Sequence, residues 1–163
     1  MAAWTTPVME RVGLGVLVLA SVVGFLAYPT YPNYDSYYSL LWGRELVGFD
    51  ALSFEAYRAP TEHPLAIAFG ALLTPLGHAA DRVMVAFTVL AFIALVAGIY
   101  VLAKTAFTPL VGFAAAALLA TRFDFPFLAA RGYIDVPYLA VVIWAAVIEA
   151  RAPRRRPLVV LLL

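Results

Sequence analysis

The sequence predicts an all-α integral membrane protein with about four transmembrane helices and interfacial amphipathic helices in a long first outer loop. Of its 163 residues, 64% are hydrophobic and 13% are charged, whereas soluble domains average about half apolar and a quarter charged residues. Several apolar runs also approach the roughly 20 residues that a helix needs to cross a bilayer core. The chain therefore belongs in a membrane.

The charge and composition exclude several other classes. A net charge of +1 provides no basic surface for nucleic acid. Cysteine is absent, which excludes disulfides, cysteine zinc sites and thiol catalysis. Two histidines are too few for a His-rich metal site.

The crossings follow from the positions of the apolar runs. The first is assigned to residues 1–28, where Val12 to Tyr28 meets the lower limit of about 17 residues. Residues 83–121 hold two more crossings, and residues 136–150 hold a fourth. Another apolar run occupies residues 157–163. We interpret it as the start of a truncated span, and the chain as the N-terminal module of a longer protein.

One further apolar segment, Pro64 to Leu76, is not expected to cross. At about 1.5 Å per residue it reaches only about 20 Å, and Pro75 interrupts it near its end. Basic residues favour the cytoplasmic side of a crossing. Three groups of basic residues lie on that side if the number of crossings between Arg11 and the arginine cluster is even: Arg11, Lys104, and Arg151 with Arg154, Arg155 and Arg156.

This topology creates two outer loops, residues 29–82 and residues 122–135. Arg122 and Arg131 then fall on the outer side, against the charge rule. We expect the short Pro64–Leu76 helix to lie at the outer interface or to dip into it.

The first outer loop opens with YPNYDSYYSLLWGREL at residues 31–46. An apolar and aromatic stripe with helical spacing predicts an amphipathic interfacial helix; it consists of Tyr34, Tyr37, Tyr38, Leu41 and Trp42. Asp35 stands at the start of this helix. It is interpreted as an N-cap, a role for which Asn33 competes, or as a catalytic carboxylate.

Glu62 and His63 precede the short apolar helix. They are a helix-start device, with Thr61 as its cap and Pro64 in the first turn, or an acid–imidazole pair that binds a metal or a phosphate. The short second loop carries Asp124 and Asp135. Asp135 either pairs with Arg131, four residues earlier, or faces a watery cavity.

Under this topology the acidic groups share one face beside the membrane. Carboxylates there suit proton abstraction from a hydroxyl and capture of a divalent cation. The aromatic first loop suits a substrate that lies half in lipid, such as a lipid-linked phosphate.

The order of five stretches resembles the GT-C superfamily of membrane glycosyltransferases. The resemblance is to the protein O-mannosyltransferase and lipid A aminoarabinose transferase type, bacterial glycosyltransferase family 39. It rests on DSYYSLLWGREL (35–46), EHPLAIAFGALLTPLG (62–77), AADRV (79–83), FTPLVGFAAAALLAT (107–121) and ARGYIDVPYLAVVIWA (130–145).

The resemblance implies a hexosyl or pentosyl transfer from a polyprenyl-phosphate donor to a hydroxyl of a lipid, glycan or protein. The reaction would occur on the extracytoplasmic face of a bacterial-type cytoplasmic membrane. It also implies that Asp35 is the general base and that Asp135 is the acid of the second loop. Glu62 and His63 would lie near the donor phosphate and, as in some members, a divalent metal.

Two positions depart from the family pattern. His63 replaces a lysine, and Tyr34 precedes Asp35 where two adjacent acids are usual. Accessory roles fall to Tyr38, Asp124 and Arg131. The alternative is a non-enzymatic membrane protein, such as a transporter or an assembly subunit. Transporters more often carry polar groups in mid-span, whereas the acids here stand at span ends and in loops.

Overall fold

The computed structural model describes residues 6–151, and every regular element in that range is helical. The prediction of an all-α chain is thus confirmed for these residues. The arginines at 154–156 and the run at 157–163 lie outside them. The elements are α1 (Thr6–Ala27), α2 (Tyr34–Gly48), α3 (Pro64–Leu73), the single-turn 3-10 helix η1 (Thr74–Leu76), α4 (Ala79–Ala106), α5 (Pro109–Thr121), α6 (Asp124–Ala130) and α7 (Asp135–Arg151).

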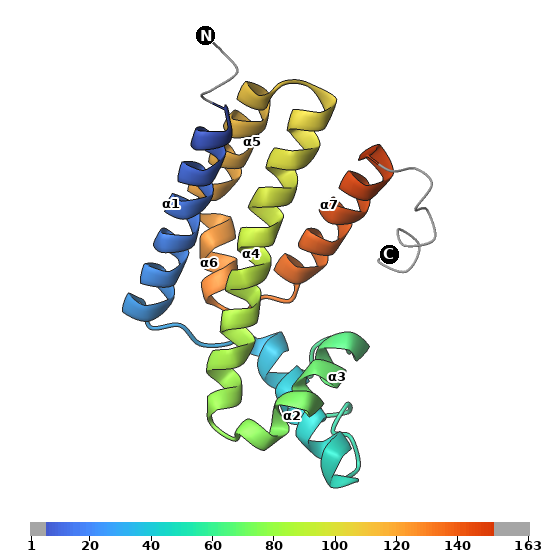
Figure 1. Cartoon of the computed structure of the whole chain (residues 1–163). Helices are drawn as coiled ribbons and strands as arrows, with labels where there is room; N and C mark the ends of the chain where they lie inside the picture. The colour runs from blue at the N-terminus through green and yellow to red at the C-terminus, as the bar shows by residue number, and fades with distance from the viewer. Residues whose placement is uncertain (1–5, 152–163) are drawn as a thin grey trace.

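Helix α4 is the centre of the molecule. It packs against α1, α5 and α6 on one side and against α7 on the other, while α2 and α3 gather where it begins (Figure 1). Phe92 and Val96 of α4 form a buried apolar cluster with Ala129 and Val136. Beside it, the fully buried Thr88 donates its hydroxyl to the carbonyl of Ala129 at 2.7 Å. The core therefore follows the length of α4.

Two helices, α1 and α4, are long and apolar enough to cross a membrane. A third crossing arises if α5 and α6, which are bent by 58° to each other, count as one broken span. The helix α5 ends at Thr121 and has 13 residues. At about 1.5 Å per residue it reaches only about 20 Å on its own. Helix α7 has 17 residues. The structure supports two to three crossings, and the fourth stays a prediction.

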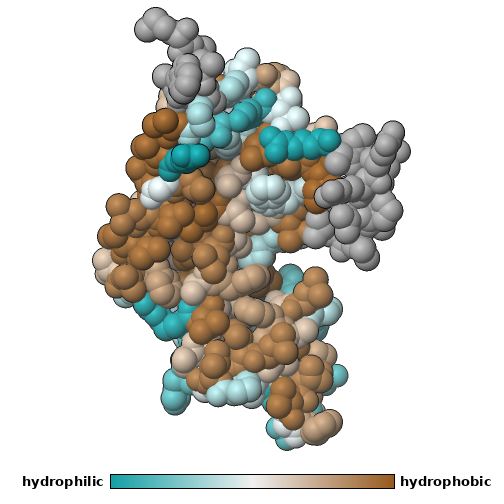
Figure 2. All heavy atoms as spheres, viewed as in Figure 1, coloured by the Kyte–Doolittle hydropathy of each residue, from teal (hydrophilic) through white to brown (hydrophobic). Residues whose placement is uncertain are grey.

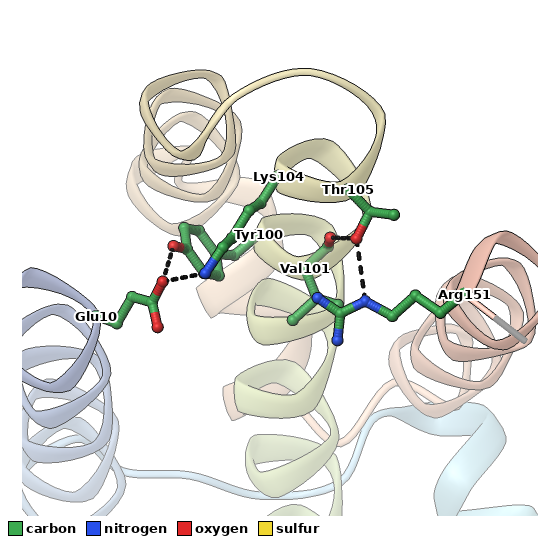
Figure 3. A network of polar contacts seen from close by, with 6 residues as sticks. All are labelled: Glu10, Tyr100, Val101, Lys104, Thr105 and Arg151. Atoms are coloured by element: carbon green, nitrogen blue, oxygen red, sulfur yellow. Dashed lines mark hydrogen bonds and ion pairs between the residues drawn. The ribbon is translucent and has the colours of Figure 1, made fainter. Parts of the chain in front are cut away.

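The ends of three helices meet at one end of the bundle (Figure 3). Glu10 near the start of α1 accepts hydrogen bonds from Tyr100, at 2.6 Å, and from Lys104 near the end of α4. Arg151 at the end of α7 donates its Nε to Thr105 at 3.0 Å. Arg11, Lys104 and Arg151 thus belong to one end of the bundle, as an even number of crossings requires.

An apolar cleft of about 740 Å³ lies between α1 and the helices α4, α5 and α6. Its walls are mostly small or apolar side chains, among them Leu17, Ala20, Val96 and Ala116. Leu17 also packs against the cluster of Phe92 and Val96, but within the described chain no part of the apolar stretch of α1 is buried. The polar contacts of α1 with α4 lie near its two ends.

The short apolar segment of α3 and η1 packs across α2. Gly43 of α2 and Gly70 of α3 lie at the crossing, where a Cβ on either residue would collide with the backbone of the other helix. Small residues allow helices to approach this closely. The segment Pro64–Leu76 is shorter than the helices that are long enough to cross a membrane.

Candidate functional site

The first turn of α2 is capped by Asn33, whose side chain accepts a hydrogen bond from the backbone N–H of Ser36 at 3.1 Å. The interpretation of Asp35 as the N-cap is therefore wrong. Asn33 precedes the first helical residue, which is the position that a capping side chain must occupy. Asp35 lies in the first turn, half-buried. Its carboxylate accepts a long hydrogen bond of 3.4 Å from the Asn33 amide.

The start of α2 is fixed against the turn that precedes α7. The backbone N–H of Asn33 donates to the carbonyl of Arg131 at 2.6 Å, and the buried Ser36 hydroxyl donates to the carbonyl of Gly132. Gly132 has a φ of 66°, and a Cβ there would lie 3.2 Å from the Cα of Pro32. A glycine suits both the left-handed backbone and the close approach. These contacts bring the segments that carry Asp35 and Asp135 together.

The loop between α2 and α3 folds back along α2. Ser53 donates its backbone N–H and its hydroxyl to Glu45, at 2.9 and 2.7 Å. Further along, the Tyr34 hydroxyl donates to the carbonyl of Arg58. The chain therefore returns to the start of α2 shortly before it reaches Glu62 and His63. The first turn of α2, which carries Asp35, thus meets the segments that lead to Glu62 and to Asp135.

The aromatic residues of α2 form a ladder. The Tyr38 ring lies 4.9 Å from that of Tyr34 and 5.2 Å from that of Trp42, which in turn contacts Phe54 at 5.0 Å. The pKa of the Tyr34 hydroxyl is raised, mainly by desolvation and then by its neighbour Tyr38. A protonated phenol is what the hydrogen bond to Arg58 requires.

The predicted stripe is only partly the packed face of α2. Trp42 is fully buried, but Tyr37 and Leu41 stay exposed. Only part of the stripe is buried because the packed face of α2 lies beside it. On that face Ser36 and Gly43 allow the turn before α7 and the helix α3 to approach closely. The buried residues of α2 are Ser36, Ser39, Leu40, Trp42 and Gly43.

At the start of α3 the structure corrects one prediction and supports another. His63, not Thr61, occupies the N-cap position, and its side chain makes no capping hydrogen bond within the described residues. Thr61 lies too far before the first helical residue to cap it. Pro64 occupies the first turn, as predicted. Glu62 is exposed and His63 is half-buried.

The second loop separates its charged residues. Asp124 is exposed and pairs with Arg122 at 3.1 Å, and Asp135 is exposed at the start of α7. Within residues 6–151, Arg131 makes no ion pair with Asp135, because the turn at Gly132 interrupts the helical spacing. The Arg131 guanidinium instead lies 3.8 Å from the centre of the Tyr31 ring.

Several residues that join the loops were not singled out by sequence reasoning. Arg82 donates to the Thr30 hydroxyl at 2.5 Å and to the carbonyl of Phe25 at 3.3 Å. It thereby joins the end of α1 to the start of α4. Ser36 and Gly132 carry the contact between the two loops. Only the glycine left a local signal, in the sequence RGYID.

The site can supply acids in different surroundings. Asp35 is half-buried, whereas Glu62 and Asp135 are more exposed. Among residues 6–151, no group of three or more His, Asp or Glu side chains could hold a metal ion. The arrangement thus places a half-buried carboxylate, next in sequence to Tyr34, in a region that three chain segments build.

Comparisons with protein-family models, with curated proteins and with solved structures find no match for this chain. The geometry of the loops around α2, together with the sequence motifs, therefore carries the functional argument.

Proposed function

We propose that this chain forms part of a membrane glycosyltransferase that moves a sugar from a polyprenyl-phosphate donor to a hydroxyl acceptor on the extracytoplasmic face. The observation that carries the proposal is the meeting of three segments at the first turn of α2. Tyr34, beside Asp35, bonds the loop that leads to Glu62, and Ser36 bonds the turn that leads to Asp135.

Asp35 is proposed as the general base. The acceptor hydroxyl would give its proton to the Asp35 carboxylate while its oxygen attacks the anomeric carbon of the sugar. The bond between that carbon and the phosphate oxygen breaks, and polyprenyl phosphate leaves with the electron pair. Because Asn33 caps α2, the Asp35 carboxylate is not consumed in capping.

The other candidates support this assignment unequally. Asp124 is already paired with Arg122 on the surface, which makes it the weakest candidate. Arg131 lies in the turn bonded to α2 and carries no carboxylate partner within residues 6–151. Among the described residues no group of three His, Asp or Glu side chains could hold a metal ion, and the divalent metal that the resemblance implies stays a prediction.

The chain is interpreted as a fragment that need not be active alone, so the proposal is tested by Asp35→Asn in the full-length protein reconstituted into liposomes. The probes are polyprenyl phosphates that carry radiolabelled mannose, glucose or arabinose, and the readout is loss of label from the lipid. We expect transfer to fall by at least about 100-fold, the lower end of what a general base contributes. The matched control is Asp50→Asn, an exposed loop acid, which should retain wild-type transfer.

Retained transfer by a folded Asp35→Asn variant would remove this residue from the base role. If the wild-type protein released label from none of the donors, the non-enzymatic alternative would gain. A second test addresses the location of the loop. A reporter fused after Leu76 should lie on the same side of the membrane as one fused after Asp35, and opposite sides would contradict an outer first loop.

A further inference from the structure

A second pocket lies between the exposed face of α2 and the start of α4. Its volume is about 400 Å³. Helix α2 contributes Tyr37, Leu41 and Arg44, and the other wall carries His78 and Asp81. Positions 37, 41 and 44 repeat at helical spacing, so they form one face of α2. This face lies apart from the contacts that join Ser36 to the turn before α7.

The basic side chains of this pocket have no partner among the described residues. Arg44 and His78 are exposed, and in the part of the chain that the structure describes neither side chain has a hydrogen bond or an ion pair. His78 also occupies the N-cap position of the 28-residue helix α4. The positive end of the helix dipole adds to the cationic character of this wall.

Asp81 is the one carboxylate among the residues that line this pocket, and it interacts with Tyr37. It acts on the Tyr37 hydroxyl, whose pKa is raised by desolvation first and then by the charge of Asp81 and a hydrogen bond to it. Asp81 is half-buried. It therefore weakens the attraction that the Arg44 guanidinium exerts on an anion.

The surroundings of the pocket are apolar. Tyr37 and Leu41 remain 44% and 43% exposed, and on the adjoining α3 and η1 Leu72 and Leu76 are 76% and 46% exposed. Figure 2 shows apolar side chains gathered over this part of the molecule as well as over α1. Exposed aromatic and aliphatic groups beside a guanidinium and an imidazole match the boundary between acyl chains and phosphates.

We infer that this pocket binds the phosphate of an anionic phospholipid, with Arg44 and His78 on the phosphate and with Tyr37 and Leu41 against its glycerol and acyl carbons. Phosphate oxygens are good acceptors for a guanidinium. The pocket would fasten the α2–α3 region to the membrane surface. This inference does not rest on the proposed glycosyl transfer.

The test uses the purified chain in detergent micelles with added phosphatidylglycerol or phosphatidylcholine, and native mass spectrometry counts the bound lipids. We expect phosphatidylglycerol to be retained in preference to phosphatidylcholine. Arg44→Gln should lower its retention by about fivefold, the effect of one arginine near an anionic lipid surface, and His78→Gln should lower it in the same direction by removing a hydrogen-bond donor. Arg58→Gln, an exposed arginine outside the pocket, should leave retention unchanged.

Asp81→Asn should act in the opposite direction and raise retention, because it removes the carboxylate that repels the phosphate. A double variant of Arg44 and His78 that binds as much phosphatidylglycerol as Arg58→Gln would overturn the inference. Displacement of the lipid by millimolar inorganic phosphate would assign the pocket to free phosphate and overturn its assignment to a lipid. Each variant should show the thermal unfolding transition of the wild-type protein, so that a loss of lipid binding is not a loss of the fold.

Discussion

The two ends of α4 hold their neighbours by different means. At the end near Ala106, long side chains make the contacts: Lys104 pairs with Glu10, and Arg151 donates to Thr105 (Figure 3). Where α4 begins, one long side chain, Arg82, joins α1 to α4, but α2 meets α3 and the turn before α7 through backbone groups, glycines and one small hydroxyl. Long side chains can shift and meet again, whereas backbone contacts fix positions. The close backbone contacts are found at the end that carries the candidate site.

The largest expected effect comes from Gly43→Ala in the crossing of α2 and α3. A Cβ there would overlap the backbone of Gly70 and Ala71, so the helices must separate. We expect a loss of about 2–3 kcal/mol, typical of overpacking, measured as a lowered thermal midpoint in detergent. The control is Gly15→Ala, where a Cβ meets no described atom within 4 Å. Equal midpoints for the two variants would contradict a rigid crossing.

The next effect is expected from Ser36→Ala. This change removes the buried hydroxyl that donates to the Gly132 carbonyl and leaves that carbonyl without its donor. The cost should be about 1–2 kcal/mol, read from the same thermal unfolding. Ser53→Ala, which removes a hydroxyl donated to Glu45 in a half-buried loop, should cost less. The reverse order would show that the contact between the loops matters little.

A smaller effect is expected at the opposite end of α4. The side chains of Lys104 and Glu10 are 32% and 31% exposed, so their pairing is screened more than that of a buried pair. A double-mutant cycle with Lys104→Gln and Glu10→Gln should give a coupling energy below about 1 kcal/mol. A coupling above about 2 kcal/mol would remove the contrast between the two ends.

The smallest effect is electrostatic and belongs to the α2 end. Desolvation and Asp81 raise the pKa of Tyr37 above its ordinary value of about 10. The stabilising contribution of the protonated phenol is therefore complete below pH 10 and is lost as pH rises through the raised pKa. Asp81→Asn should lower this pKa toward the ordinary value. Phenolate absorbance during alkaline titration, with Tyr37→Phe as reference, measures the change.

Sequence patterns predicted the helices well where the pattern was local. The apolar run that predicted a crossing forms the helix α4, and the proline expected in the first turn of α3 lies there. Patterns could not count the crossings, because hydropathy predicts an end near Thr121 but does not reveal whether α5 and the bent α6 together form one span. Asn33 and Asp35 are both good capping residues, so only the backbone geometry decides between them.

The candidate site was less accessible to sequence reasoning. The acids at 35, 62 and 135 could be identified as unusual from their positions beside apolar runs. Their relative placement depends on contacts such as Ser36 with Gly132, which join residues 96 positions apart. Arg131 illustrates the same limit. Its spacing to Asp135 predicted an ion pair, but the turn at Gly132 directs it to the Tyr31 ring.

The open middle of α1 has a practical consequence. Ala20 lines the apolar cleft, and the chain contains no cysteine. A single cysteine introduced at this position would be the only thiol available to a spin label or a fluorophore, and the cleft gives the probe room. Such a probe would sense how the spacing of the first helix changes with bilayer thickness, while its two attachment points remain intact.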